Sequence, residues 1–124
     1  MKFFVALVLS LAICGFVISQ QTPTTAGDWV TIEYNNNNDE LRRSLFFGVD
    51  ESVSMAITAG QIADGVWNCT QVNSLKAQVV AGINYNFDVN LEDGTGDTAH
   101  MEFIVFDGLD GSTMELVSYQ VLKM

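Results

Sequence analysis

Histidine and cysteine are scarce in this 124-residue chain, which holds one histidine and two cysteines. The histidine, His100, has no evident serine or cysteine partner in the sequence, so nucleophilic catalysis is not indicated. No C-x-x-C pair, phosphate-binding loop or paired metal-ligand motif occurs. The acidic turns around Asp93 and Asp107 lack the spacing of a calcium-binding loop. We therefore expect a protein that is not an enzyme and that binds no metal or cofactor.

Basic residues are also few, with 5 lysines and arginines against 15 aspartates and glutamates and a net charge of −10 at pH 7. Nucleic acids and anionic membranes select lysine and arginine, so neither is an expected partner. The acidic surface suits solubility or a basic partner.

Only one long hydrophobic run is present, from Phe3 to Ile18, and Lys2 precedes it. Such a segment resembles a signal peptide, here cleaved near Ser19. A membrane anchor is the alternative, but it needs roughly 20 apolar residues and flanking charges. The predicted division is a signal peptide at 1–19 and one domain at 20–124. We expect the protein outside the cell or within the secretory-lysosomal pathway, and as a monomer.

Cleavage at that point would remove Cys14 and leave Cys69 without an intramolecular partner. A buried thiol is the favoured interpretation, and an intermolecular bridge is the alternative. Cys69 also lies within the glycosylation sequon Asn68-Cys69-Thr70. A sequon with cysteine at its middle position is a poorer acceptor of a glycan, and this one lies in a predicted strand. We therefore expect Asn68 to be unmodified.

Proline is nearly absent, and the single one, Pro23, lies in a polar segment at 20–26 that predicts an extended arm. A short strand is expected over 28–34 and a turn over the four asparagines at 35–38. A helix is expected from Asp39 onward, because apolar residues recur there about every four positions. Gly48 interrupts this helix and predicts a close approach to a sheet.

Everything after residue 66 has strand character. Strands are expected over 66–77, 83–91, 99–106 and 114–122, with Gly/Asp turns over 92–97 and 107–112. The second of these strands alternates apolar and polar residues with a period of two, which indicates one buried face. The predicted fold is α+β, one amphipathic helix packed on a wrapped antiparallel sheet of about five strands.

The pentapeptide Gln78-Val79-Val80-Ala81-Gly82 lies between the first two of these strands and is predicted to form a hairpin tip. Two valines on such a tip would form an exposed apolar surface, which usually marks a contact with another molecule. The alternative is that both valines are ordinary strand residues turned inward.

The order of elements and several motifs resemble the cystatin family. The pentapeptide matches its Q-x-V-x-G loop, the segment 41–49 resembles its helix signature, and Gly27 falls at the place of its N-terminal glycine. The last two strands, with Leu109 in the loop between them, resemble the stefin branch. Two features depart from the family pattern. The loop has neither the Pro-Trp of secreted cystatins nor the Leu-Pro common in stefins, and a predicted secretion signal precedes a stefin-like domain without a disulfide.

The resemblance implies a reversible, competitive inhibitor of papain-like cysteine proteases that occludes their cleft with an N-terminal arm and two hairpin loops. The residues it implies for protease binding are Gly27, Gln78, Val79, Val80, Ala81, Gly82 and Leu109. Leu109 could instead plug the core, and Gly27 could be a plain linker. A secreted cystatin-fold binding or storage protein without inhibitory activity is the alternative function.

Overall fold

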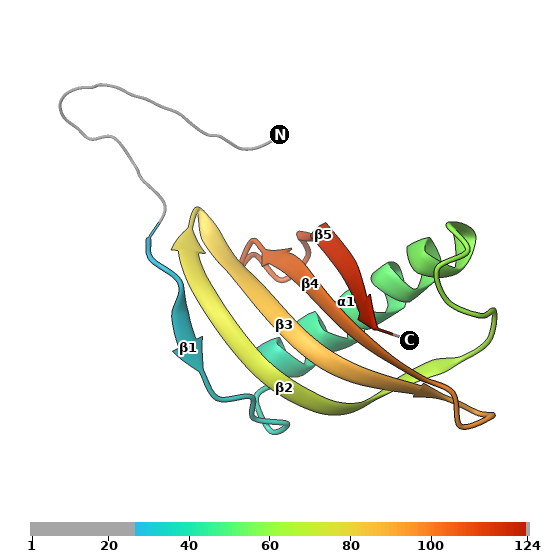
Figure 1. Cartoon of the computed structure of the whole chain (residues 1–124). Coiled ribbons are helices and arrows are strands. Elements are labelled where there is room, and N and C mark those ends of the chain that lie inside the picture. Colours follow the sequence, from blue (N-terminus) through green and yellow to red (C-terminus); the bar gives the residue numbers. More distant parts are fainter. Residues whose placement is uncertain (1–26, 124) are drawn as a thin grey trace, which may run out of the picture.

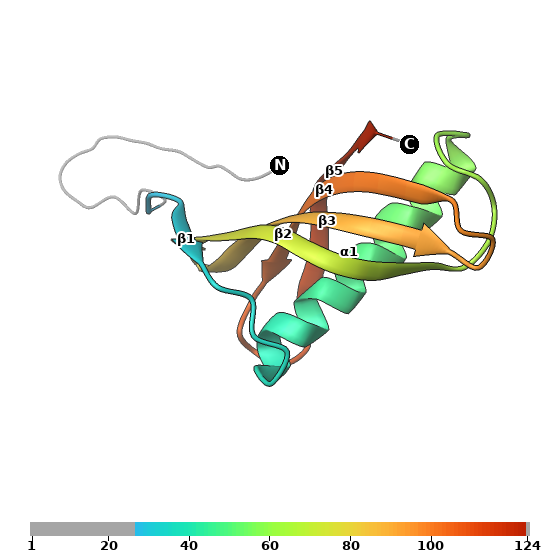
Figure 2. The same cartoon turned by 60° about the horizontal axis from the view of Figure 1, so that its bottom comes forward.

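The structure is a computed structural model that describes residues 27–123. The predicted signal peptide and the predicted arm at 20–26 lie outside the described residues. The chain forms a single five-stranded antiparallel sheet in the order β1-β2-β3-β4-β5, and one helix packs on one face of it (Figures 1 and 2). The elements are β1 (Val30–Ile32), α1 (Asp39–Thr58), β2 (Trp67–Val80), β3 (Gly82–Asp93), β4 (Thr98–Asp107) and β5 (Met114–Lys123). The predicted α+β fold is confirmed.

The core lies between α1 and the concave face of the curved sheet. Along β3 and β4 every second residue is buried, as the period of two in the sequence predicts. The rings of Phe87 and Phe103 lie side by side at the centre, with centroids 5.3 Å apart. The buried apolar residues that β3 and β4 place on this face are Tyr85, Phe87, Val89, Leu91, Ala99, Met101, Phe103 and Val105, and β2 adds Trp67 and Leu75.

Helix α1 is capped by Asn38, the residue directly before its first helical residue. The Asn38 side chain accepts hydrogen bonds from the backbone N–H groups of Glu40 and Leu41, at 3.0 and 3.1 Å. Asp39, where the sequence predicts the start, is the first helical residue, and its carboxylate pairs with Arg42 at 2.7 Å. The acids in this first turn also complement the partial positive charge of the helix N-terminus.

Small residues allow α1 to lie close to the sheet. They recur every four positions on the buried side of the helix and are Ser44, Gly48, Ser52 and Ala56. A Cβ atom on Gly48 would overlap the ring of Phe103, so the predicted close approach at this glycine is confirmed. Phe46, an apolar residue of the same helix, lies outside this buried side and is 55% exposed.

Strand β1 is shorter than the predicted segment 28–34. Only Val30, Thr31 and Ile32 pair with β2, opposite Ala77, Lys76 and Leu75. Strand β2 is much longer, so β1 covers only a part of its outer edge. The register of this pairing places Gly27, the start of the described chain, beside Val79 at the end of β2.

Candidate functional site

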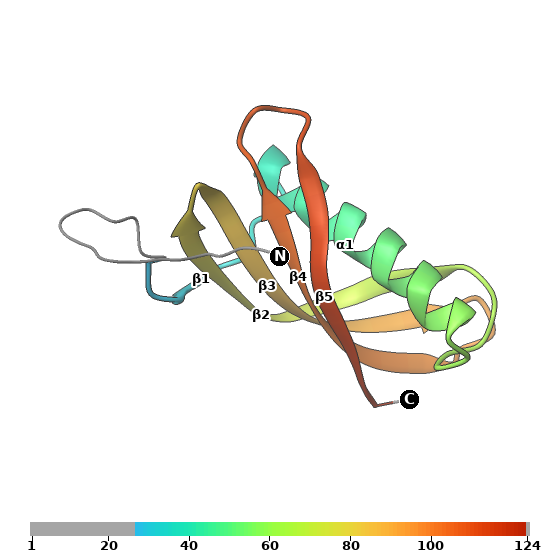
Figure 3. The ribbon, with the colours of Figure 1, turned by 90° about the horizontal axis from the view of Figure 1, so that it is seen from above.

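Three segments that are distant in the sequence meet at one end of the sheet. They are the start of the described chain at Gly27, the tip of the β2–β3 hairpin and the loop between β4 and β5 (Figures 1 and 3). Gly27 adjoins β2, because its N–H donates to the carbonyl of Val79 at 2.9 Å. The loop after β4 adjoins the start of β3, because Ile83 pairs with Asp107. The candidate site residues from the sequence therefore lie together, with the hairpin tip in the middle.

The β2–β3 hairpin is paired up to its last residues. Val80 lies opposite Gly82, and Ala81 alone forms the bend. The side chain of Val79 is 65% exposed, Ala81 is exposed, and Val80 is half-buried. Val79 is not turned into the core. The hairpin tip is where the sequence predicts it, and it carries Val79 and Ala81 outward.

Gln78 connects this hairpin to the start of the chain. Its Nε2 donates to the carbonyl oxygen of Gly27 at 3.1 Å, and its Oε1 accepts from Asn84 Nδ2 at 3.1 Å. The side-chain amide therefore bridges β3 and the N-terminal segment. Both polar atoms of the Gln78 amide thus bond to other residues of this protein, and they hold the hairpin and Gly27 in position.

Gly82 fixes the hairpin against the neighbouring strand. Its φ of 131° lies in the region that favours glycine, and an added Cβ would lie 2.6 Å from the carbonyl oxygen of Asp107 and 2.8 Å from the ring of Phe106. Glycine is required here by close packing on β4 as well as by the backbone. Gly27 is held in a different way, by hydrogen bonds to β2 from its N–H group and to its carbonyl oxygen.

The β4–β5 loop is closed by two aspartate side chains. Asp107 Oδ1 accepts from the N–H of Leu109 at 2.8 Å. Asp110 accepts from the N–H groups of Ser112 and Thr113 at 2.9 and 2.6 Å, and from the Thr113 hydroxyl at 2.5 Å. These bonds, led by that of the Thr113 hydroxyl, hold the pKa of Asp110 well below its usual value. The loop is therefore ordered by hydrogen bonds between residues that are close in sequence.

Leu109 is held outward by a costly backbone conformation. Its φ is +63°, the only positive φ at a non-glycine residue among those described, and its side chain is 50% exposed. A left-handed leucine costs roughly 1–2 kcal/mol. Such strain is concentrated at functional sites. Leu109 does not plug the core.

Trp29 is a further exposed residue at this end, and it is not among the binding residues predicted from the sequence. It is 39% exposed, follows Gly27 by two residues and precedes β1. Tryptophan is enriched among the residues that dominate binding energy at protein interfaces. A tryptophan just outside a short strand, beside a candidate site residue, was the signal available in the sequence.

The single histidine lies away from this end, on the exposed face of the sheet. His100 Nε2 lies 2.5 Å from Asp88 Oδ1, which also accepts from Asn73 Nδ2 at 3.0 Å. Within residues 27–123, no group of three or more His, Cys, Asp or Glu side chains is placed to hold a metal ion. In the same part of the chain, no helix has the length and apolar character needed to cross a membrane.

Among solved structures, the fold is similar to that of the salivary cystatin from the soft tick Ornithodoros moubata. The two are 11% identical, with a TM-score of 0.55 over 77% of this chain and 96% of the tick protein. No protein-family model and no curated protein sequence matches the chain. The fold is therefore cystatin-like, and at this identity the likeness extends to the fold alone.

Proposed function

We propose that this protein is a reversible, competitive inhibitor of papain-like cysteine proteases. The observation that carries this proposal is the alignment of three exposed segments at one end of a cystatin-like fold. The protease-contact residues would be Gly27, Val79, Val80, Ala81, Gly82 and Leu109, with Gln78 positioning Gly27 and the hairpin. We add Trp29 to these protease-contact residues because it is exposed at the same end of the sheet.

The exposed side chains offer apolar surface for burial in a protease cleft. A fully buried valine or leucine contributes about 1.5–3 kcal/mol. Val79 and Leu109 project from the two loops, of which strand pairing orders the first and aspartate hydrogen bonds order the second. Because little chain entropy is lost when such loops dock, a small contact area can support tight binding.

The inhibition would involve no reaction with the protease. A wedge formed by the hairpin tip, the Leu109 loop and the N-terminal segment would fill the cleft and keep substrate from the catalytic cysteine. Substrate and inhibitor would then exclude each other. Export through the predicted signal peptide would place the inhibitor with secreted or lysosomal proteases.

Titration of papain with the purified protein tests the proposal. We expect the KM of a small peptide substrate to rise with unchanged kcat, and activity to return on dilution. Absence of inhibition at protein concentrations on the order of 1 μM would contradict it. A binding or storage protein without inhibitory activity would then be the better account, and the sparse second loop, with Leu109 as its single large apolar side chain, favours that alternative.

A further inference from the structure

The first half of β2 has an open outer edge. Strand β1 pairs only with Leu75, Lys76 and Ala77, and no other described strand lies on that side of Trp67–Ser74. The pairing of β2 with β3 shifts register between Cys69 and Gln71, and again between Val72 and Ser74. An unpaired strand edge is a site for unwanted pairing with other chains, and proteins commonly protect it.

The sequon Asn68-Cys69-Thr70 lies on this open edge. Asn68 and Thr70 are exposed, and no hydrogen bond within residues 27–123 involves the Asn68 side chain. It is the only N-x-[ST] sequence in the chain. The sequence predicts an unmodified Asn68 partly because this residue lies in a strand, and the structure exposes its side chain to solvent.

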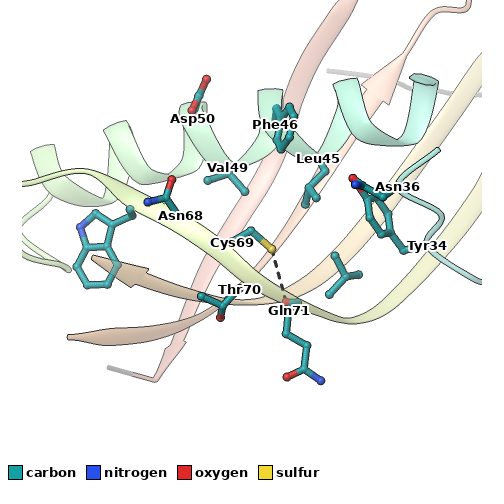
Figure 4. Close-up of a pocket in the computed structure, with 12 residues that line it drawn as sticks. Tyr34, Asn36, Leu45, Phe46, Val49, Asp50, Asn68, Cys69, Thr70 and Gln71 are labelled. Atoms are coloured by element: carbon teal, nitrogen blue, oxygen red, sulfur yellow. Dashed lines mark hydrogen bonds between the residues drawn. The ribbon is translucent and has the colours of Figure 1, made fainter. Parts of the chain in front are cut away.

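A groove of about 650 Å³ runs beside this edge between β2 and α1 (Figure 4). Asn68, Cys69 and Thr70 line it from β2, and the exposed ring of Phe46 lines it from the helix. The Cys69 thiol, the central residue of the sequon, is half-buried, and its Sγ lies 3.6 Å from the carbonyl oxygen of Gln71. The edge therefore has open space around it for a bulky substituent.

We propose that Asn68 carries an N-linked glycan when the chain is exported from a eukaryotic cell. This inference rests on the export part of the proposed function and not on protease binding. The amide nitrogen Nδ2 of Asn68 attacks the anomeric carbon of an oligosaccharide linked to a polyprenyl diphosphate. A C–N bond forms, the C–O bond to the diphosphate breaks, the lipid diphosphate leaves with the electron pair, and a proton leaves Nδ2.

Transfer would take place before the sheet forms. In the folded protein the Thr70 hydroxyl donates to the carbonyl oxygen of Asn90 at 3.3 Å, across the β2–β3 pair. That bond engages the hydroxyl that a sequon must present to the transferase. Asn90 lies 20 residues further along the chain, so the sequon emerges during synthesis before its partner strand is available.

The glycan would leave the candidate protease site free. Asn68 lies near the start of β2 and Val79 near its end, so the two are roughly 35 Å apart along the strand. A glycan at Asn68 would cover the open edge and the groove at the opposite end from the hairpin tip. Inhibition of papain should therefore be the same with and without it.

Expression of the full chain in animal cells tests this inference. We expect a peptide-N-glycosidase to shift the secreted protein on a gel and to convert Asn68 to aspartate, as located by peptide mass spectrometry. Asn68→Gln and Thr70→Ala should abolish the shift, and Thr70→Ser should keep it. An unmodified chain, whether secreted or retained in the cells, would overturn the inference.

The result is independent of the titration of papain. A glycosylated protein without inhibitory activity would contradict the proposed function and support the modified Asn68. An unmodified protein that inhibits papain would do the reverse.

Discussion

The two loops at the candidate site are built in different ways. The β2–β3 tip depends on the sheet, because its strands pair as far as Val80 and Gly82 and its shape relies on the packing of Gly82 on β4. The β4–β5 loop depends on itself, because Asp107 and Asp110 bond to backbone N–H groups two or three residues away.

This difference separates stability from binding at the two loops. A substitution at Gly82, where the first loop packs on β4, should destabilise the whole sheet. Substitutions in the second loop should have small effects on stability. The first loop also presents two exposed apolar side chains, Val79 and Ala81, whereas Leu109 is the one large apolar side chain of the second loop. We therefore expect the first loop to contribute most of the binding energy.

Gly82→Ala should have the largest effect on stability. Its Cβ would lie 2.6 Å from the Asp107 carbonyl oxygen at a φ of 131°, and we expect a loss of about 3 kcal/mol in the free energy of unfolding. Gly111→Ala in the second loop is the control, because Gly111 has φ +83° but nothing within 4 Å of its Cβ position. It should cost only about 1 kcal/mol. Equal losses in urea denaturation would contradict the difference between the loops.

Gln78→Ala should lower stability by roughly 1–2 kcal/mol, because it removes the bonds to Gly27 and Asn84. It should also weaken papain inhibition by about tenfold, since Gly27 keeps only one of its two hydrogen bonds to β2. Asn84→Ala removes one of the two bonds and should show a smaller change in both measurements. If Gln78→Ala inhibits as well as the parent protein, the bridge has no role in the site.

Leu109→Asn should move stability and inhibition in opposite directions. Asparagine tolerates the left-handed conformation, so we expect unfolding to become less favourable by about 0.5–1 kcal/mol, while the loss of apolar surface weakens inhibition severalfold. Leu109→Ala keeps the strain and loses the same contact, so it should weaken inhibition without stabilising the protein. Stabilisation by both variants, or by neither, would exclude strain at this position.

Asp110→Asn should have the smallest effect, and one that depends on pH. Because hydrogen bonds lower the pKa of Asp110 in the folded protein, its ionised carboxylate stabilises the fold above the usual value of 3.8. That contribution is lost as the pH falls toward the lowered pKa. The difference in thermal stability between parent and variant should be greatest near neutral pH and shrink in acid. A difference that is constant with pH would contradict a role for the charge.

The local parts of this fold are predictable from the sequence. The period of two in 83–91 and the four-residue spacing from Leu41 to Val53 identify β3 and α1, and Gly48 marks the close approach of the helix to the sheet. The predicted end of an element can be wrong by one residue where two neighbouring residues suit the same position equally well. Asn38 caps the helix one residue before Asp39, and either residue type is a good cap.

Features that depend on strand register are not predictable in this way. Gln78 bonds to Gly27, 51 residues away, and only the pairing of β1 with β2 brings them together. The exposure of Leu109 follows from a backbone conformation that leucine disfavours. The open edge at Asn68 follows from the register of β1, which pairs only with Leu75–Ala77 near the other end of β2.

The central claim is that the hairpin tip enters the protease cleft, and a pair of valine substitutions tests it most directly. Val79 lies at the tip, and Val66, 76% exposed, precedes the opposite end of β2. Inhibition constants for papain should be measured for Val79→Asp and Val66→Asp side by side. We predict that Val79→Asp raises the constant by about 100-fold or more and that Val66→Asp leaves it unchanged. Equal constants for the two variants would contradict the claim.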